Sequence, residues 1–83
     1  MSVYIEWDNG EAYGAANWED LAELVKMSTP LTPPDTIGKW MDNVSYRSQE
    51  FYGKKLQYTD AESFFRELFR VGILTTLIEK EGK

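Results

Sequence analysis

An Asn-Gly pair that follows a run of alternating residues constrains the fold of this chain more than any other feature. From Val3 to Asp8, apolar and polar residues alternate with the period of a half-buried strand. Asn9-Gly10 then supplies two residues that accept positive φ, which a type I′ hairpin turn requires. The sequence therefore predicts a β-hairpin over Ser2 to Gly14.

A two-residue loop at Asn9-Gly10 would fix the register of this hairpin. It places Asp8 opposite Glu11 and Trp7 opposite Ala12, so two acids lie side by side at the tip. The predicted core face holds Val3, Ile5, Trp7 and Ala12. The predicted outer face holds Tyr4, Glu6 and Tyr13.

The segment after the hairpin has the spacing of an amphipathic helix. Asn17 is suited to cap its N-terminus, with Asp20 three residues later in the manner of a capping box. A first helix that runs to about Met27 is predicted. Its buried stripe consists of Trp18, Leu21, Ala22 and Val25.

All three prolines of the chain lie in Ser28 to Pro34, which predicts an internal loop rather than a domain boundary. Thr32 before Pro33-Pro34 is typical of a helix start. A second helix is predicted over Asp35 to Tyr52, with Gly53 as a left-handed C-terminal cap. Its predicted buried stripe consists of Ile37, Trp40, Met41, Val44, Ser48 and Phe51.

One more helix and one more strand are predicted in the last third of the chain. Lys54 to Tyr58 is either a connector or a short edge strand. Thr59-Asp60-Ala61-Glu62 has the pattern of a capping box, and Gly72 ends the helix that it opens. Ile73 to Ile78 is rich in β-branched residues and predicts a strand that pairs with the hairpin. The inward stripe of this third helix consists of Ala61, Phe64, Phe65, Leu68 and Val71.

This order predicts a single small α+β domain over residues 1–83. The N-terminal hairpin and the C-terminal strand form a sheet packed with about three helices, in the order β-β-α-α-(β)-α-β. A composition with 42% hydrophobic and 14% aromatic residues is too apolar for a disordered chain. The absence of cysteine, of a signal-peptide pattern and of an apolar run long enough to span a membrane favours a cytoplasmic protein.

Several classes of chemistry are excluded by residues that the chain lacks. Without histidine or cysteine there is no ordinary zinc ligand set, no histidine base and no thiol nucleophile. The glycines form no phosphate-binding loop, and one acidic turn supplies too few ligands for calcium. We therefore expect no cofactor, no metal and no enzymatic activity, although a small carboxylate enzyme remains a distant alternative.

The distribution of charge is more informative than any motif. No Lys or Arg occurs before Lys26, so the net charge of -5 belongs to the N-terminal third. This acidity either serves solubility or forms a face that competes with nucleic acid for a basic groove. Direct binding of nucleic acid is not expected from a chain with this charge. The candidate binding acids are Glu6, Asp8, Glu11, Glu19, Asp20 and Glu23.

Tyrosines are the second group of candidate contact residues. Tyr46 lies opposite the buried stripe of the second helix, and Tyr4 and Tyr13 share the predicted outer face of the hairpin with Glu6. Aromatic side chains often anchor protein interfaces. An open sheet face also has to be covered by a helix, a partner or solvent. These tyrosines are therefore either contact sites or ordinary surface residues.

In size, acidity, lack of Cys and His, and aromatic density, the chain resembles the small proteins with which phages and mobile elements block host defence, such as anti-CRISPR or anti-restriction proteins. This resemblance covers composition only and assigns no residue. The leading hypothesis is a non-enzymatic protein-binding module, an inhibitor whose partner has a basic nucleic-acid-binding surface. The alternative is a structural or assembly protein that forms homo-oligomers through an apolar or aromatic patch.

Overall fold

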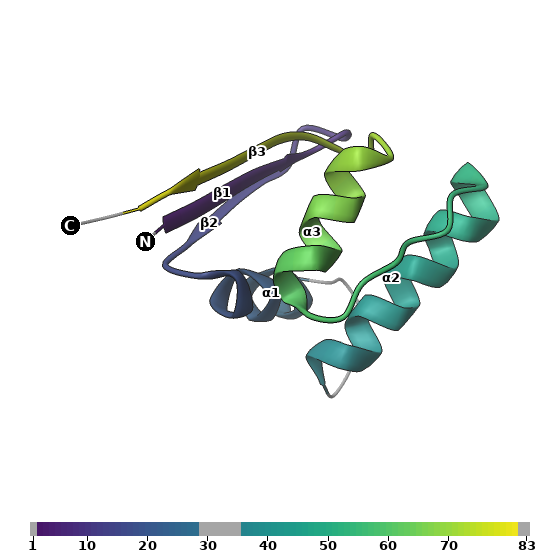
Figure 1. Cartoon of the computed structure of the whole chain (residues 1–83), viewed down its shortest axis with the longest axis horizontal. Coiled ribbons are helices and arrows are strands. Elements are labelled where there is room, and N and C mark those ends of the chain that lie inside the picture. The colour runs from purple at the N-terminus through teal and green to yellow at the C-terminus, as the bar shows by residue number, and fades with distance from the viewer. Residues whose placement is uncertain (1, 29–35, 82–83) are drawn as a thin grey trace.

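The computed structural model describes residues 2–28 and 36–81 of the chain. Its elements follow the order β-β-α-α-α-β, which confirms the predicted α+β fold (Figure 1). The segment from Lys54 to Tyr58 is a connector and forms no strand. The elements are β1 (Ser2–Trp7), β2 (Ala12–Ala15), α1 (Trp18–Met27), α2 (Ile37–Tyr52), α3 (Ala61–Arg70) and β3 (Leu74–Lys80).

The three strands form one antiparallel sheet in the order β2-β1-β3. The last strand therefore pairs with the hairpin, as predicted, and lies at an edge of the sheet. Tyr4 on the central strand faces Gly14 on β2 and Ile78 on β3. The pairing of β1 with β3 is regular from Ser2 to Glu6, after which a bulge shifts the register.

The register of the hairpin differs by one residue from the predicted one. The Trp7 N–H donates to the Glu11 carbonyl at 2.7 Å, and the Gly10 N–H donates to the Trp7 carbonyl at 3.1 Å. The loop therefore has three residues, 8–10, and ends on Gly10 with φ +93°. This is the pattern of a tight turn followed by a left-handed glycine. The predictions of a two-residue turn and of Asp8 opposite Glu11 are wrong.

The shift of one residue moves the side chains of β2 to the other face of the sheet. Tyr13 lies opposite Ile5 and packs partly buried against the core, whereas Ala12 is exposed. The predictions that Tyr13 faces outward and Ala12 faces inward are therefore wrong. The backbone N–H of Asp8 donates to the Ile73 carbonyl at 2.9 Å. This bond ties Asp8 to the segment before β3 and takes it out of the hairpin ladder.

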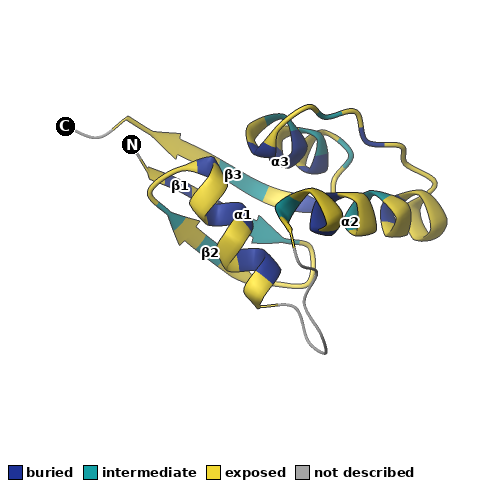
Figure 2. Ribbon diagram, turned by 90° about the horizontal axis from the view of Figure 1, so that it is seen from below, coloured by how far each residue is buried: buried dark blue, intermediate teal, exposed yellow. Residues whose placement is uncertain are grey.

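Helices α1 and α3 cover one face of the sheet, and α2 packs outside them (Figures 1 and 2). The buried apolar residues of all layers form one cluster, in which Phe64 and Phe65 are fully buried. The Trp40 ring of α2 lies 5.3 Å from Phe64 and 6.0 Å from Phe65, measured between ring centroids. Trp18 of α1 stacks on Phe65 at 6.0 Å. The core positions predicted for α1 are confirmed.

The helix ends are set by capping residues, most of them near the predicted places. Asn17 caps α1, and Gly53 ends α2 with φ +66°, both as predicted. Helix α2 begins at Ile37 with Thr36 as its N-cap, two residues later than predicted. The predicted start signal at residues 32–34 lies outside the described residues.

Helix α2 extends beyond the core that its first half helps to form. Trp40 and Ser48 on its inner stripe are buried, but Phe51 on the same stripe is 81% exposed, as the exposed end of α2 in Figure 2 illustrates. The predicted inward position of Phe51 is therefore wrong. Periodicity identifies the side of a helix that faces its neighbours, but α3 has 10 residues against the 16 of α2. No helix in the described part of the chain covers the last turn of α2.

Candidate functional site

Helices α1 and α3 begin next to each other, and their first turns bring acidic side chains together. In α1, Glu19 and Asp20 occupy the first turn, where negative charge interacts favourably with the helix dipole. Asn17 fixes this end, because its Oδ1 accepts the Asp20 N–H at 2.8 Å and its Nδ2 donates to the Asp20 carboxylate at 3.2 Å. Both acidic residues are exposed. The start of α1 thus presents two exposed carboxylates, of which Asp20 is held by Asn17.

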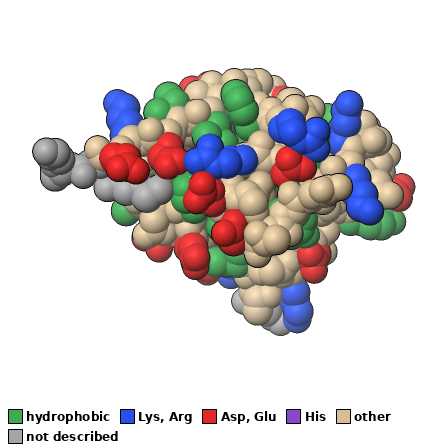
Figure 3. Space-filling model, in the orientation of Figure 1, with side chains coloured by type: hydrophobic (Ala, Val, Ile, Leu, Met, Phe, Trp, Pro, Cys, Tyr) green, Lys and Arg blue, Asp and Glu red, His purple; other side chains and the backbone are tan. Residues whose placement is uncertain are grey.

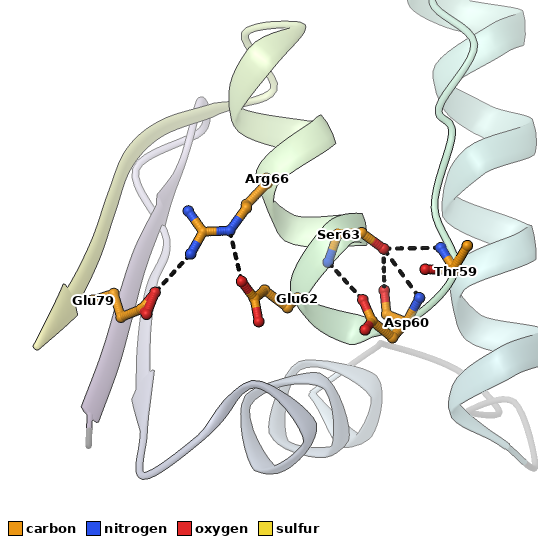
Figure 4. A network of polar contacts seen from close by, with 6 residues as sticks. All are labelled: Thr59, Asp60, Glu62, Ser63, Arg66 and Glu79. Carbon is orange, nitrogen blue, oxygen red and sulfur yellow. Dashed lines mark hydrogen bonds and ion pairs between the residues drawn. The ribbon is translucent and has the colours of Figure 1, made fainter. Parts of the chain in front are cut away.

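The start of α3 is fixed by a capping box. Asp60 Oδ1 accepts the Ser63 N–H at 2.9 Å, and Ser63 Oγ accepts the N–H groups of Asp60 and Thr59 at 3.0 and 2.8 Å (Figure 4). The box lies one residue later than the predicted box of Thr59 and Glu62, since aspartate caps more strongly than threonine. The N–H and the hydroxyl of Ser63 hold the pKa of Asp60 below its ordinary value. Asp60 therefore stays ionised at neutral pH.

An open hollow of about 520 Å³ lies between the two helix starts. The buried Trp18 contributes to its lining, and the Arg66 guanidinium lies over the indole ring, 5.4 Å from the ring centroid. Trp18 Nε1 is buried and has no hydrogen-bond partner among the described residues. The other lining residues are Asn17, Glu19, Asp20, Asp60 and Glu62. Four of the six lining residues are therefore acidic.

Arg66 connects this group to the sheet. Its Nε donates to Glu62, four residues earlier on the same helix, at 3.0 Å, and its Nη2 donates to Glu79 of β3 at 2.6 Å (Figure 4). One guanidinium is thus shared by two carboxylates and leaves the group with an excess of negative charge. We define the α1–α3 acidic surface as Glu19, Asp20, Asp60, Glu62 and Glu79.

Several of the acidic side chains visible in the space-filling view lie close together on the left and lower left of the molecule, where α1, the start of α3 and the end of β3 lie, and others are spread over the rest of this face (Figure 3). At physiological salt, the electrostatic potential of a charge is screened beyond about 8 Å, so like charges closer than this add to one common potential. The caps hold the two helix starts in place, so the carboxylates need little rearrangement to meet a partner. The surface is suited to bind a cationic group.

The structure brings together only part of the acids that the sequence singles out. Glu19 and Asp20 lie in the α1–α3 acidic surface. Glu23 lies one turn further along α1 and pairs at 3.0 Å with Lys26, which is largely buried. The hairpin tip lies at the opposite end of β2 from the start of α1 (Figure 1). The predicted acids therefore do not form one continuous patch.

The two acids of the hairpin tip interact with tyrosines. The Tyr52 hydroxyl donates to Asp8 at 3.0 Å and links the end of α2 to the hairpin. The Tyr13 hydroxyl donates to Glu11 at 2.9 Å. The bond to Asp8 raises the pKa of Tyr52, and partial burial followed by the bond to Glu11 raises the pKa of Tyr13. Asp8 and Glu11 thus have local structural partners.

The remaining candidates lie on two further faces. The Tyr4 hydroxyl donates to Glu6 at 2.7 Å on the outer face of the sheet, which the helices leave uncovered (Figure 1). Tyr46 is 66% exposed and points away from the core side of α2, as predicted. Neither residue contributes to the α1–α3 acidic surface.

Sequence reasoning missed Asp60, Glu62 and Glu79 as members of the site. The capping motif and the pair of Glu62 with Arg66 were visible in the sequence, but both indicate local helix structure. The pattern along the chain gives no sign that α3 starts beside α1. The contact of Arg66 with β3 likewise exists only after the sheet and the helices have packed.

Within residues 2–28 and 36–81, no group of three or more acidic side chains is placed to hold a metal ion. None of the helices in these ranges is both long and apolar enough to cross a membrane. No family model, no curated protein and no solved structure matches the chain. Function is therefore inferred from the surface itself.

Proposed function

We propose that this domain is a protein-binding module without enzymatic activity, and that the α1–α3 acidic surface contacts a basic surface of its partner. The observation that carries the proposal is the convergence of two capped helix starts, which places four acidic residues around one hollow. Charges held on rigid elements lose little conformational entropy on binding. Complementary charge also accelerates association and selects the partner.

The finer proposal is that the partner handles nucleic acid and that the domain occupies its nucleic-acid site. A groove that binds phosphates presents Lys and Arg side chains to any rigid array of negative charge. Two of the six acids that precede the first basic residue, Glu19 and Asp20, lie in this surface and support this reading. So does the likeness in composition to phage and mobile-element inhibitors of host defence. An inhibitor of this kind would act in the cytoplasm of the host.

Self-association is the alternative, and one observation favours it. The outer face of the sheet exposes Tyr4 and Ile78 side by side, and none of the helices in residues 2–28 and 36–81 covers them. This face is distinct from the α1–α3 acidic surface. One molecule can therefore both bind a partner through the α1–α3 acidic surface and self-associate through the outer face of the sheet.

Affinity capture from a host lysate, followed by mass spectrometry, would identify the partner. Titration calorimetry with the captured protein would then test the surface. We expect the dissociation constant to rise roughly tenfold or more when salt is raised from about 50 to about 200 mM, because several ion pairs are screened. The double variant Glu19→Lys with Asp20→Lys should abolish binding.

A matched control is offered by the hairpin tip. Asp8→Lys with Glu11→Lys changes the net charge by the same amount but lies outside the α1–α3 acidic surface, so it should bind nearly as well as the parent. Circular dichroism would verify that both double variants are folded. Equal binding by the parent and the Glu19, Asp20 variant would contradict the proposal. An equal loss of affinity in both double variants would show that binding depends on the net charge of the domain and not on the α1–α3 acidic surface.

A further inference from the structure

We propose that two copies of this chain associate through β3, which pairs antiparallel with β3 of the second copy and continues the sheet across both molecules. In the sheet order β2-β1-β3, the last strand pairs with β1 on one side only. The N–H and C=O groups on its other side need water or another strand as partner. This proposal does not depend on the proposed function, because it rests on the free edge of β3 and on residues of the outer face of the sheet.

The backbone of β3 is suited to such pairing. Leu74–Lys80 is the longest strand and contains neither proline nor glycine. Its pairing with β1 is regular over Thr76 to Lys80, and the bulge lies at the other end, beside Trp7. A regular stretch of edge strand such as Thr76 to Lys80 is the kind to which a further strand adds.

The outer face beside this edge is apolar at its centre. Tyr4 and Ile78 face each other across β1 and β3 and are 37% and 42% exposed. A hollow of about 340 Å³ lies here, lined by these two residues together with Ser2 and Lys80. A second copy that brings its own Ile78 alongside would bury part of the exposed Ile78 side chain.

The charged residues near the edge of β3 indicate that the strand added there belongs to a second copy of this chain. Glu6 lies on the outer face, where it accepts hydrogen bonds from Tyr4 at 2.7 Å and from Thr76 at 3.4 Å. No described cation forms an ion pair with Glu6, and no described carboxylate forms one with Lys80. Lys80 of the same copy lies opposite Ser2, so its backbone is about 13 Å or more along the strands from Glu6. The face therefore carries an acid and a base that do not meet within one molecule.

An antiparallel pairing centred on Ile78 brings these charges together. Ile78 then lies beside Ile78 of the second copy, and Thr76 lies beside Lys80 of the second copy. Since Glu6 is the neighbour of Thr76 on β1, the backbones of Glu6 and of that Lys80 are two strand spacings, about 10 Å, apart. Extended Lys and Glu side chains span this distance. The two-fold symmetry of the pair creates the contact twice.

Sedimentation equilibrium of the purified chain over about 10 μM to about 1 mM tests the proposal. We expect a dimer with twice the 9.6 kDa mass of the chain. Glu6→Lys and Lys80→Glu should each raise the dimer dissociation constant about tenfold or more, because each places like charges opposite one another. The double variant Glu6→Lys with Lys80→Glu should restore the parent value, since it exchanges the two charges.

The matched controls are Glu50→Lys and Lys55→Glu, which make the same charge changes at exposed positions outside the sheet and should leave dimerisation unchanged. Circular dichroism would confirm that all variants are folded. A chain that stays monomeric at about 1 mM would overturn the proposal. So would single variants that dimerise like the parent, or a double variant that is weaker than either single one.

Discussion

Gly10 closes the hairpin loop at φ +93°, a backbone conformation that residues with a Cβ rarely adopt. The Asn-Gly pair indicates from sequence that a turn lies here. It does not indicate the length of the loop, because a glycine with positive φ fits both a two-residue and a three-residue turn. In the structure, the first loop residue, Asp8, donates to the Ile73 carbonyl, a residue far away in the sequence that no local pattern connects with the turn.

Gly10→Val should lower the free energy of unfolding by about 1 to 3 kcal/mol, because it forces a β-branched residue to positive φ. No neighbouring atom lies within 4 Å of a Cβ added at Gly10, so the effect is backbone strain and not a clash. Gly14→Ala is the control, since its φ is not in this region and its Cβ would make ordinary contacts. Chemical denaturation measures both. An unchanged Gly10→Val variant would show that the loop does not need this conformation.

Glu67 couples α3 to the connector before it. Its carboxylate accepts hydrogen bonds from Arg70 at 2.7 and 2.9 Å and from the Gln57 N–H at 3.1 Å. The bonds from Arg70, followed by the bond from Gln57, lower the pKa of Glu67 from 4.5 to about 2. Sequence spacing shows the contact with Arg70, but not the one with Gln57.

The stabilising effect of Glu67 should be present above pH 4.5 and lost as the pH falls toward about 2, because the unfolded chain takes up the proton first. Thermal unfolding of the parent and of Glu67→Gln across this range would measure the effect. We expect the difference in melting temperature between the two proteins to shrink as the pH is lowered. A difference that stays constant with pH would contradict the assigned role of this carboxylate.

At the scale of elements, hydrophobic periodicity predicts which side of a helix faces the core, but not how far along the helix that side is buried. Trp40 and Phe51 lie on one stripe of α2, yet Trp40 is 4% exposed and Phe51 is 81% exposed. The aromatic rings of α3 lie beside Trp40. Whether a neighbour reaches the end of a helix depends on the lengths and angles of packed elements, which no local pattern contains.

Trp40→Ala should therefore cost about 3 to 5 kcal/mol, as removal of a buried aromatic ring does, and leave the domain largely unfolded at about 37 °C. Phe51→Ala on the same helix should change the free energy of unfolding by less than about 0.5 kcal/mol. Thermal unfolding followed by circular dichroism compares the two variants. Equal stability of the Trp40 and Phe51 variants would show that the first half of α2 does not pack on the core.

At the scale of the whole molecule, the sequence indicates an excess of acid but not its arrangement. Glu19 and Asp20 could be named in advance because the first helix has to expose them. Their convergence with Asp60, Glu62 and Glu79 depends on where α3 begins in space. The tip acids Asp8 and Glu11 instead bind tyrosines at the far end of the hairpin.

The central claim, that the α1–α3 acidic surface occupies a nucleic-acid site, is tested most directly by displacement. A labelled oligonucleotide is bound to the captured partner, and its release is followed by fluorescence anisotropy as the domain is added. We predict full release by the parent and by the Asp8→Lys, Glu11→Lys variant, and no release by the Glu19→Lys, Asp20→Lys variant. An oligonucleotide that stays bound while the domain also binds the partner would contradict the claim.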